Sequence, residues 1–328
     1  MPPSTRRFGS FLTLSALALL AGCATPTRVD VPAASPIVDV ARRTTIDEAA
    51  LVDALAGVRF RLLGEIHDDP AHHVARARLV RDIARRGLRP AVVFEQFDLE
   101  HDVALVAAQT PGATPEALAT AGELDRKGWD WPLHAPIVAA ALDAHLPIRA
   151  GNLSRRRIDA LVRAGAPASA GPNARWLVRL NRAAWSDAQA RTLHDEIVES
   201  HCNMLPAAVV PRLVLGERMR DAAMAQALVD DATPDGAILV AGDGHVRANL
   251  GVPVYLHAPG LPGAKASSIS VGFVEPDTPP GAPVALDAGT ITRLVADHPG
   301  FDYLWVTPRV ARPDPCAAFR RSTAAKDE

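Results

Sequence analysis

The chain has 328 residues, enough for one large domain or two smaller ones. Hydrophobic residues make up 48% of it and charged residues 22%, which are the proportions of a globular protein with a sizeable core. The formal net charge of −2 argues against a nucleic-acid partner, because such proteins carry a marked excess of basic residues.

The N-terminus has the organisation of a lipoprotein signal peptide. Arg6 and Arg7 give it a positive start, and the apolar run at 11–20 is too short to span a membrane. The run ends in LAGC at 20–23, which resembles the lipobox of bacterial lipoproteins. The resemblance implies a signal peptide at 1–22, cleavage before Cys23 and acylation of that cysteine. An ordinary signal peptide with an incidental cysteine is the alternative.

Residues 23–44 are expected to form a lipid-anchored tether, since the first part of this stretch is rich in Pro, Ala, Ser and Thr. Ala24 follows the cysteine, which by resemblance favours the outer membrane over the inner one. No later segment is long and apolar enough to span a bilayer. We therefore expect a water-soluble α/β domain at 45–310, held at the outer membrane by its anchor, and a C-terminal tail at 311–328.

The domain begins with the pattern of a βαβ unit. In residues 58–63, apolar and polar side chains alternate and the last residues are all apolar, as in a strand that enters a core. A helix to about residue 86 follows, with Asp68 or Asp69 as its N-cap. Residues 91–97 predict a second buried strand. Strand, helix and strand within about forty residues are typical of a parallel sheet.

Later segments repeat this pattern. A helix is expected at 132–145, and residues 154–231 show almost no strand signal and predict several helices. Further strands are expected at 147–151, 237–241, 252–257, 268–274 and 303–307. The predicted fold class is α/β, with a mostly parallel central sheet flanked by helices and a smaller all-helical subdomain inserted at about 154–231.

Polar side chains follow several of the predicted strands. Glu65 and His67 come directly after the first one, and two residues apart in extended chain they point the same way. Glu95 lies near the end of the next strand, Asn152 follows another, and the GDGH segment at 242–245 follows a fourth. Because ligands bind at the carboxyl ends of parallel strands, we expect these groups to meet at one edge of the sheet.

The chemistry of this group leaves three options open. Imidazole and carboxylate ligands suit a divalent metal such as zinc or manganese, and Glu65, His67, Glu95 and His245 are the candidate ligands. They also suit an axial haem ligand with carboxylate partners, or general acid–base chemistry. A purely structural role is the alternative, with Glu65 paired to an arginine.

The two histidines that follow in the predicted helix have a simpler interpretation. Either His72 or His73 is expected to face solvent, since adjacent helical positions point about 100° apart.

The cysteines beyond the signal peptide leave two alternatives open. Cys202 and Cys316 could pair in an oxidising compartment, but two separate buried thiols are an equal alternative.

Seven short segments together resemble the ChaN family of haem-binding lipoproteins, which is similar to the wider group of Tiki metalloproteases and erythromycin esterases. They run in family order from about residue 45 to 257, and each is weak alone. The segments are LLGEIHDDPAHH (62–73), VVFEQFD (92–98), GWDWPLH (128–134), IRAGNLSR (148–155), HCNMLP (201–206), GERMRDAAMA (216–225) and AGDGHVRANLGVP (241–253).

The resemblance implies haem as the ligand, a homodimer with two stacked haems, an outer-membrane haem receptor as partner and a role in haem or iron uptake. It implies a haem pocket containing Glu65, His67, Glu95 and His245. His134 stands where such proteins often carry a tyrosine, and haem iron accepts either ligand. Trp129 would pack against the porphyrin, unless it is a helix-packing aromatic. Among the arginines, Arg218, Arg247 or Arg155 would meet the propionates.

The resemblance does not decide whether the protein is an enzyme. A haem-binding protein without turnover is our first hypothesis. A metal-dependent hydrolase that uses the same Glu and His residues is the second, and an envelope protein with a vestigial pocket is the third.

Overall fold

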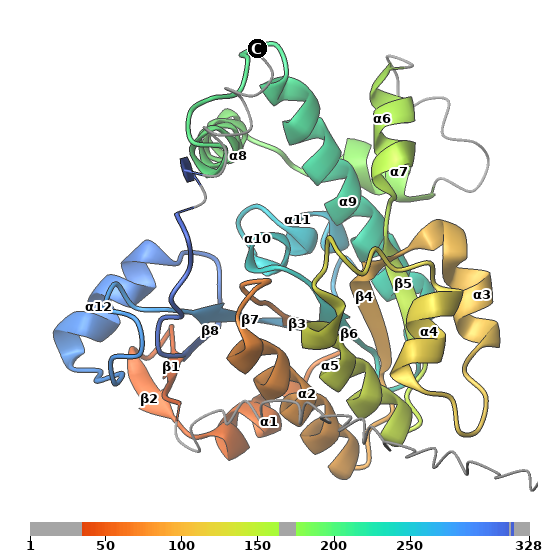
Figure 1. The fold of residues 1–328 in the computed structure, drawn as a ribbon, viewed down its shortest axis with the longest axis horizontal. Helices are drawn as coiled ribbons and strands as arrows, with labels where there is room; N and C mark the ends of the chain where they lie inside the picture. Colours follow the sequence, from red (N-terminus) through yellow and green to blue (C-terminus); the bar gives the residue numbers. More distant parts are fainter. Residues whose placement is uncertain (1–34, 164–174, 315, 318–328) are drawn as a thin grey trace, which may run out of the picture.

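The structure is a computed structural model that describes residues 35–163, 175–314 and 316–317. The predicted signal peptide and Cys23 lie outside the described residues. The central sheet has eight strands in the order β2-β1-β8-β7-β3-β6-β4-β5 (Figure 1). The strands are β1 (Ile37–Asp39), β2 (Thr44–Ile46), β3 (Phe60–Leu63), β4 (Ala91–Asp98), β5 (Ile148–Asn152), β6 (Ala237–Val240), β7 (Ser268–Val274) and β8 (Tyr303–Val306).

The six strands from β8 to β5 in this order are parallel, and β1 pairs antiparallel with both β8 and β2. All four residues of β3 and all four of β6 are buried, as in a sheet covered on both faces. The predicted mostly parallel α/β fold is therefore confirmed.

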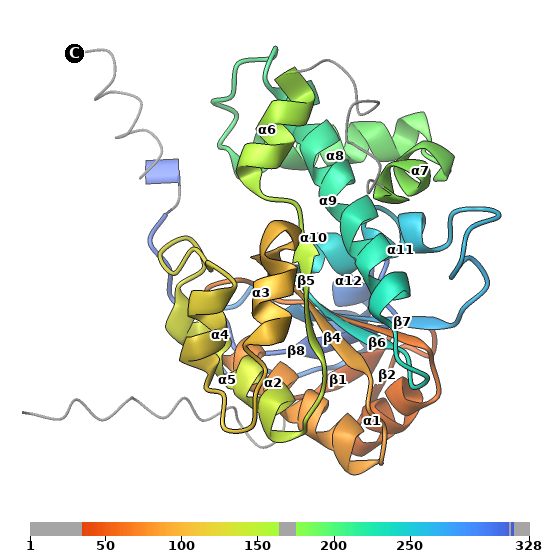
Figure 2. The ribbon, with the colours of Figure 1, turned by 90° about the vertical axis from the view of Figure 1, so that its right-hand side faces the viewer.

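Helices cover both faces of the sheet (Figures 1 and 2). One face packs on α1 (Glu48–Ala56), α2 (Pro70–Arg85), α3 (Asp102–Ala107), α4 (Pro115–Ala121) and α5 (Trp131–Asp143), and the short 3-10 helix η1 (Leu99–His101) precedes α3. The other packs on α9 (Val210–Asp231), α10 (Asp243–Val246), α11 (Val252–Leu256) and α12 (Ala288–Asp297). These helices form one hydrophobic core on each side of the sheet.

The predicted helical region is present between β5 and β6. It contains α6 (Arg155–Arg163), α7 (Arg175–Arg182), α8 (Asp187–Ser200) and the long α9. Figures 1 and 2 show α6, α7 and α8 gathered beyond the end of the sheet at which β5 leads into α6, while α9 runs back down to the sheet. The helical subdomain therefore stands over the carboxyl ends of the parallel strands.

Two local predictions differ from the structure. Residues 252–256 form helix α11 instead of a strand. Pro253 explains this, because its ring suits the first turn of a helix while its missing N–H weakens a central strand. In addition, β1 lies inside the stretch predicted as a tether, so the sheet begins earlier in the chain than we expected.

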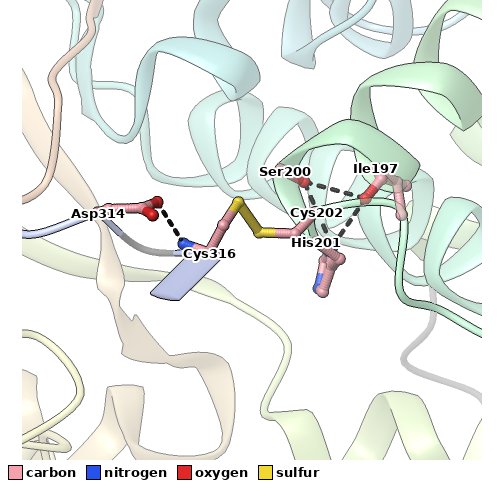
Figure 3. The surroundings of a disulfide bond; sticks show 6 residues. All are labelled: Ile197, Ser200, His201, Cys202, Asp314 and Cys316. Carbon is pink, nitrogen blue, oxygen red and sulfur yellow. Dashed lines mark hydrogen bonds between the residues drawn. A yellow bond between two sulfur atoms is a disulfide. The ribbon is translucent and has the colours of Figure 1, made fainter. Parts of the chain in front are cut away.

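A disulfide joins Cys202, just after α8, to Cys316 in the C-terminal tail (Figure 3). The tail is also fixed by Arg312, whose guanidinium lies 2.6 Å from Asp68 Oδ1 and 2.6 Å from Glu275 Oε2. The cross-link, which the sequence left open, ties the helical subdomain to the segment that follows β8.

Replacing both cysteines with serine should lower the free energy of unfolding by up to about 4–5 kcal/mol. The cross-link joins residues 114 apart in the sequence, and closing so long a loop removes much conformational entropy from the unfolded chain. Urea unfolding with and without a reducing agent measures this. The reductant should weaken the natural protein and leave the double variant unchanged; equal stability of the two oxidised proteins would contradict the prediction.

Among the described residues, no helix is both long enough and apolar enough to cross a membrane.

Candidate functional site

The loop after β3 is held tightly at the carboxyl edge of the sheet. Gly64 has no room for a side chain, because a Cβ there would collide with the carboxylate of Asp243. The carbonyl of Glu65 accepts a hydrogen bond of 2.9 Å from the backbone N–H of Asp243. At the end of the loop, Asp69 caps α2 as predicted, its Oδ1 accepting from Ala71 N at 2.8 Å. The loop is therefore anchored at both ends.

Glu65 is fully buried and uses both carboxylate oxygens. Oε1 lies 2.7 Å from His67 Nδ1 and 3.3 Å from Gln96 Nε2. Oε2 contacts Arg76 Nη2 and lies 3.0 Å from His73 Nδ1. A carboxylate is costly to bury unless it is paired, and these contacts supply the partners of Glu65.

His67 is the accessible member of this group. Its side chain is 52% exposed, whereas that of Glu65 is 0% exposed. Since Nδ1 donates to the carboxylate, Nε2 carries the free lone pair. The ring packs edge-on against Trp129 at a centroid distance of 5.0 Å. Gly242 lies against the Nε2 side, and a Cβ there would come within 3.1 Å of this nitrogen.

A second ion pair adjoins the first. Glu95 Oε2 accepts from Gly242 N at 2.7 Å, and Oε1 lies 3.2 Å from His245 Nε2. The other ring nitrogen of His245 lies 2.7 Å from Asp221 Oδ1. Burial alone would lower the pKa of His245, but Glu95 and Asp221 outweigh it and raise this pKa well above its ordinary value. Burial opposes ionisation of Glu95, but the charge of His245 outweighs it and holds the pKa of Glu95 below the usual range.

Gly242 connects the two pairs, because a Cβ there would lie 2.9 Å from His67 Cε1 and 3.7 Å from Glu95 Oε2. Glu65, His67, Glu95 and His245 thus meet at one edge of the sheet, although they come from segments far apart in the sequence. A pocket of about 300 Å³ opens beside His245. Its lining comes from α8, α9 and the α10 region: Leu193, Glu196, Ile197, Ser200, His201, Glu217, Asp221, Gly244, His245, Arg247 and Leu250.

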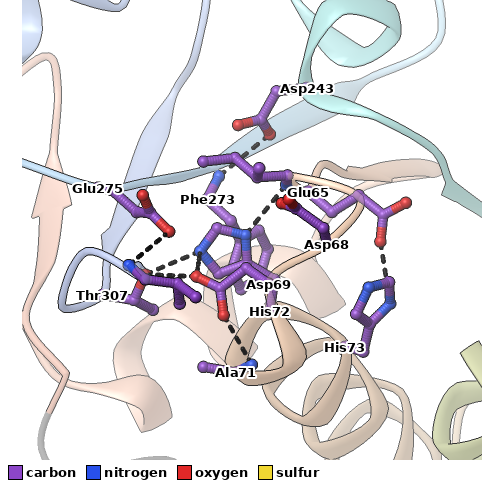
Figure 4. Close-up of polar contacts among 12 residues, drawn as sticks. Glu65, Asp68, Asp69, Ala71, His72, His73, Asp243, Phe273, Glu275 and Thr307 are labelled. Atoms are coloured by element: carbon purple, nitrogen blue, oxygen red, sulfur yellow. Dashed lines mark hydrogen bonds and ion pairs between the residues drawn. The ribbon is translucent and has the colours of Figure 1, made fainter. Parts of the chain in front are cut away.

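Both histidines at the start of α2 are buried, so the expectation that one faces solvent is wrong. The helix packs on the sheet and beside α5 in one hydrophobic core, and His73 contacts His134 of α5. His72 accepts from Ile66 N at 3.0 Å and lies 2.8 Å from Thr307 Oγ1 (Figure 4). Burial lowers the pKa of His72 to about 3, so the ring is neutral at pH 7.

His134 lies behind the site, in the first turn of α5. It is 0% exposed, with its ring centroid 4.3 Å from that of His73 and 5.8 Å from that of Trp129. Neither ring nitrogen has a hydrogen-bond partner among the described residues. Burial lowers the pKa of His134 to about 2. A porphyrin could reach this ring only if α5 moved.

The neutral state of His134 predicts how its replacement changes acid stability. The ring is protonated below about pH 6.5 in the unfolded chain but stays neutral in the folded protein. The contribution of His134 to the free energy of unfolding therefore falls by about 1.4 kcal/mol for each unit that the pH drops below this value. The stability of His134→Leu relative to the natural protein should therefore rise by about 2 kcal/mol between pH 7 and pH 5.

Urea unfolding of both metal-free proteins at the two pH values measures this difference. Other titrating groups occur in both proteins and cancel. An unchanged difference would show that His134 titrates normally and is not buried as described.

The ligand atoms of the four predicted metal ligands do not converge on one point, because they form two separate carboxylate–imidazole pairs. Within the described part of the chain, the group whose ligand atoms all lie within 4.8 Å of one another is Glu65, His73 and His134. A metal site built on these residues would thus differ in composition from the predicted one.

Two of the three predicted propionate-binding arginines have other partners. Arg218 Nε donates to Tyr255 Oη at 3.0 Å, and the guanidinium lies 4.5 Å from the ring centre of Trp185. Arg247 forms a two-pronged pair with Glu196 at 3.0 and 2.6 Å. Arg155 is exposed at the start of α6. Asn152, at the end of β5, accepts from Arg220 at 3.0 Å, so it supports the edge without facing Glu65.

Two site residues were not predicted from the sequence. Arg76 lies three residues after His73, and this spacing on a helix could have placed it on the same face. Asp221 lies inside α9, in a region read only as helical, and nothing in its neighbourhood pointed to His245.

Comparison with known proteins places the chain in a family. Residues 51–256 match the family described as haem-binding uptake, Tiki superfamily, ChaN. The fold is similar to that of ChaN from Campylobacter jejuni, a structure of cofacial haem binding, with a TM-score of 0.61 and 19% identity over 82% of this chain and 95% of that one.

A second structure, the type III effector HopBA1, aligns with a TM-score of only 0.40 and 11% identity over 79% of this chain and 91% of that one. No curated protein sequence matches the chain. The family match spans more than half of the residues, so the chain belongs to the ChaN family of haem-binding uptake proteins in the Tiki superfamily.

Proposed function

We propose that this chain binds haem through the Nε2 atom of His67. The observation that carries this is the pairing of a half-exposed imidazole with a buried carboxylate, at 2.7 Å from Nδ1 to Glu65 Oε1. Such a carboxylate fixes the tautomer and the ring orientation, and it makes the free nitrogen a stronger donor to iron. His134 is the weaker candidate because its ring is buried.

The surroundings of His67 suit a flat apolar ligand. The indole of Trp129 stands beside the imidazole, and Gly242 places no side chain against Nε2. Because His67 is half exposed, one chain would leave much of the haem uncovered. We propose that a second chain covers it, so that two haems stack face to face in a homodimer, as the cofacial binding by the Campylobacter protein suggests.

The cellular role follows from the family and from the N-terminal sequence. We propose that the protein is a lipoprotein of the outer membrane, acylated at Cys23, that takes part in haem uptake. The LAGC segment at 20–23 and the family's role in haem uptake support this. An outer-membrane haem receptor would be the partner that delivers or accepts the haem.

A pair of glycine variants tests haem binding at this edge of the sheet. In Gly242→Ala the new methyl group would lie 2.9 Å from His67 Cε1, so the ring must shift away from its carboxylate-held position. Haem affinity should fall by about tenfold or more, the range seen when support of a metal-binding histidine is lost.

Gly244→Ala is the matched control, because a Cβ there meets nothing within 4 Å. Titration of haem into each full-length protein, followed by the Soret absorption band, gives the affinities. Equal affinity of the two variants would argue that haem binds elsewhere.

A further inference from the structure

Unsatisfied polar atoms concentrate on the buried side of Glu65. Arg76 Nε and Nη1, Gln96 Oε1 and both ring nitrogens of His134 have no hydrogen-bond partner among the described residues. A buried polar group without a partner costs about 1–3 kcal/mol, so several in one cluster require an explanation. Haem bound at His67 does not supply it, because these atoms lie behind the carboxylate and away from solvent.

The geometry of the cluster is that of a metal site. Glu65, His73 and His134 each offer one ligand atom, and these atoms all lie within 4.8 Å of one another. Ligands around a tetrahedral ion at about 2.1 Å are about 3.4 Å apart, so only small inward side-chain movements are needed. His134 contributes an unpartnered, fully buried imidazole to this group.

The two imidazoles are prepared as ligands. His73 Nε2 lies 2.9 Å from the carbonyl oxygen of His67 and donates to it, which leaves the Nδ1 lone pair facing Glu65 Oε2 at 3.0 Å. Such a bond to the outer nitrogen is the usual support of a metal-binding histidine.

Arg76 is the cation at this point in the metal-free structure. Its Nη2 contacts Glu65 Oε2 and lies 2.9 Å from His73 Nδ1, between two of the ligand atoms. Its other guanidinium nitrogens lack partners, so the contacts with Glu65 and His73 are what hold it in place.

We infer that Glu65, His73 and His134 form a buried site for a divalent first-row transition metal such as Fe²⁺ or Zn²⁺, for which Arg76 competes as an internal cation. Two imidazoles and one carboxylate are a ligand set that such ions accept. The site is separate from the proposed haem ligand: Glu65 would give Oε2 to the metal and keep Oε1 for His67. The metal would thus sit one carboxylate away from the haem iron.

Co²⁺ is a suitable probe, because its visible absorption reports its ligands. The full chain, free of haem and treated with chelator, should bind a single Co²⁺ ion. His134→Leu should weaken this binding by about 100-fold or more, since one of three protein ligands is lost. Because this ring makes no hydrogen bonds, its replacement should leave the fold intact.

Arg76→Gln gives an independent test, because a merely structural role of these residues would not predict tighter metal binding by this variant. Removal of the competing cation should strengthen Co²⁺ binding by about tenfold or more, and Co²⁺ should raise the melting temperature of this variant. Co²⁺ binding by His134→Leu equal to that of the natural protein would overturn the proposal. So would a failure of both the natural protein and Arg76→Gln to bind the ion.

The outcome is distinguishable from that of haem binding. His134→Leu should keep the Soret shift on haem addition, and His67→Ala should keep the Co²⁺ absorption. X-ray absorption at the cobalt edge should show two imidazole ligands, and a spectrum with oxygen ligands alone would also overturn the proposal.

Discussion

Haem should bind to a His67→Ala variant at least about 100-fold more weakly than to the natural protein, and without the Soret band of a histidine-ligated haem. Loss of a partner behind a metal-binding histidine costs about 10–100-fold, and loss of the iron ligand itself should exceed that range. The fold should be little affected, because the side chain is 52% exposed and its ring bonds to a single carboxylate. Haem titration and thermal unfolding of the same preparation measure both effects.

His194 provides a closely matched control for this variant. Its side chain is 50% exposed and its Nδ1 lies 3.0 Å from the carboxylate of Asp195, so it resembles His67 in exposure and pairing. It lies on α8 but is not among the residues that line the pocket beside His245, and His194→Ala should bind haem normally. Similar losses in both variants would show that the effect of His67 is not specific to the site.

Replacing Glu65 with leucine should lower the free energy of unfolding by about 3–5 kcal/mol, the cost of leaving one partner of a buried ion pair uncompensated. Arg76 is 0% exposed and forms an ion pair with Glu65. Gln96 would also lose its acceptor. Urea unfolding of the single variant measures the loss.

The double variant Glu65→Leu with Arg76→Met separates the ion pair from other effects of the substitution. Replacing both charges with apolar groups of similar volume should recover most of the lost stability, because no buried charge remains unpaired. If the double variant is no more stable than Glu65→Leu alone, then Arg76 is not the group that Glu65 neutralises.

The sequence predicted the parts of the fold that repeat a simple pattern. Buried parallel strands are continuous apolar runs, so β3, β4, β6 and β7 could be recognised from the sequence. The low strand content between β5 and β6 indicated the helical subdomain. The three-residue strands β1 and β2 are too short to show a period. They exist because β8 offers an edge with which β1 can pair, which is information from the far end of the chain.

The site was predictable where its residues follow strands and unpredictable where they come from helices. Parallel topology brings Glu65, Glu95 and the 242–245 segment to one edge, and the order of the strands then decides which ones touch. Asp221 reaches His245 only through the packing of α9, which leaves no mark in its local sequence. The burial of His134 and the partners of Arg218 likewise depend on tertiary packing, so family position alone gave them haem roles that their contacts do not favour.

The crystal structure of the haem complex, with the iron located by its anomalous scattering, tests the central proposal most directly. The account predicts an iron peak within bonding distance of His67 Nε2, with Nδ1 of the same ring still on Glu65 and Trp129 beside the porphyrin. Iron bound to a different side chain, or haem bound away from the carboxyl edge of the sheet, would contradict it.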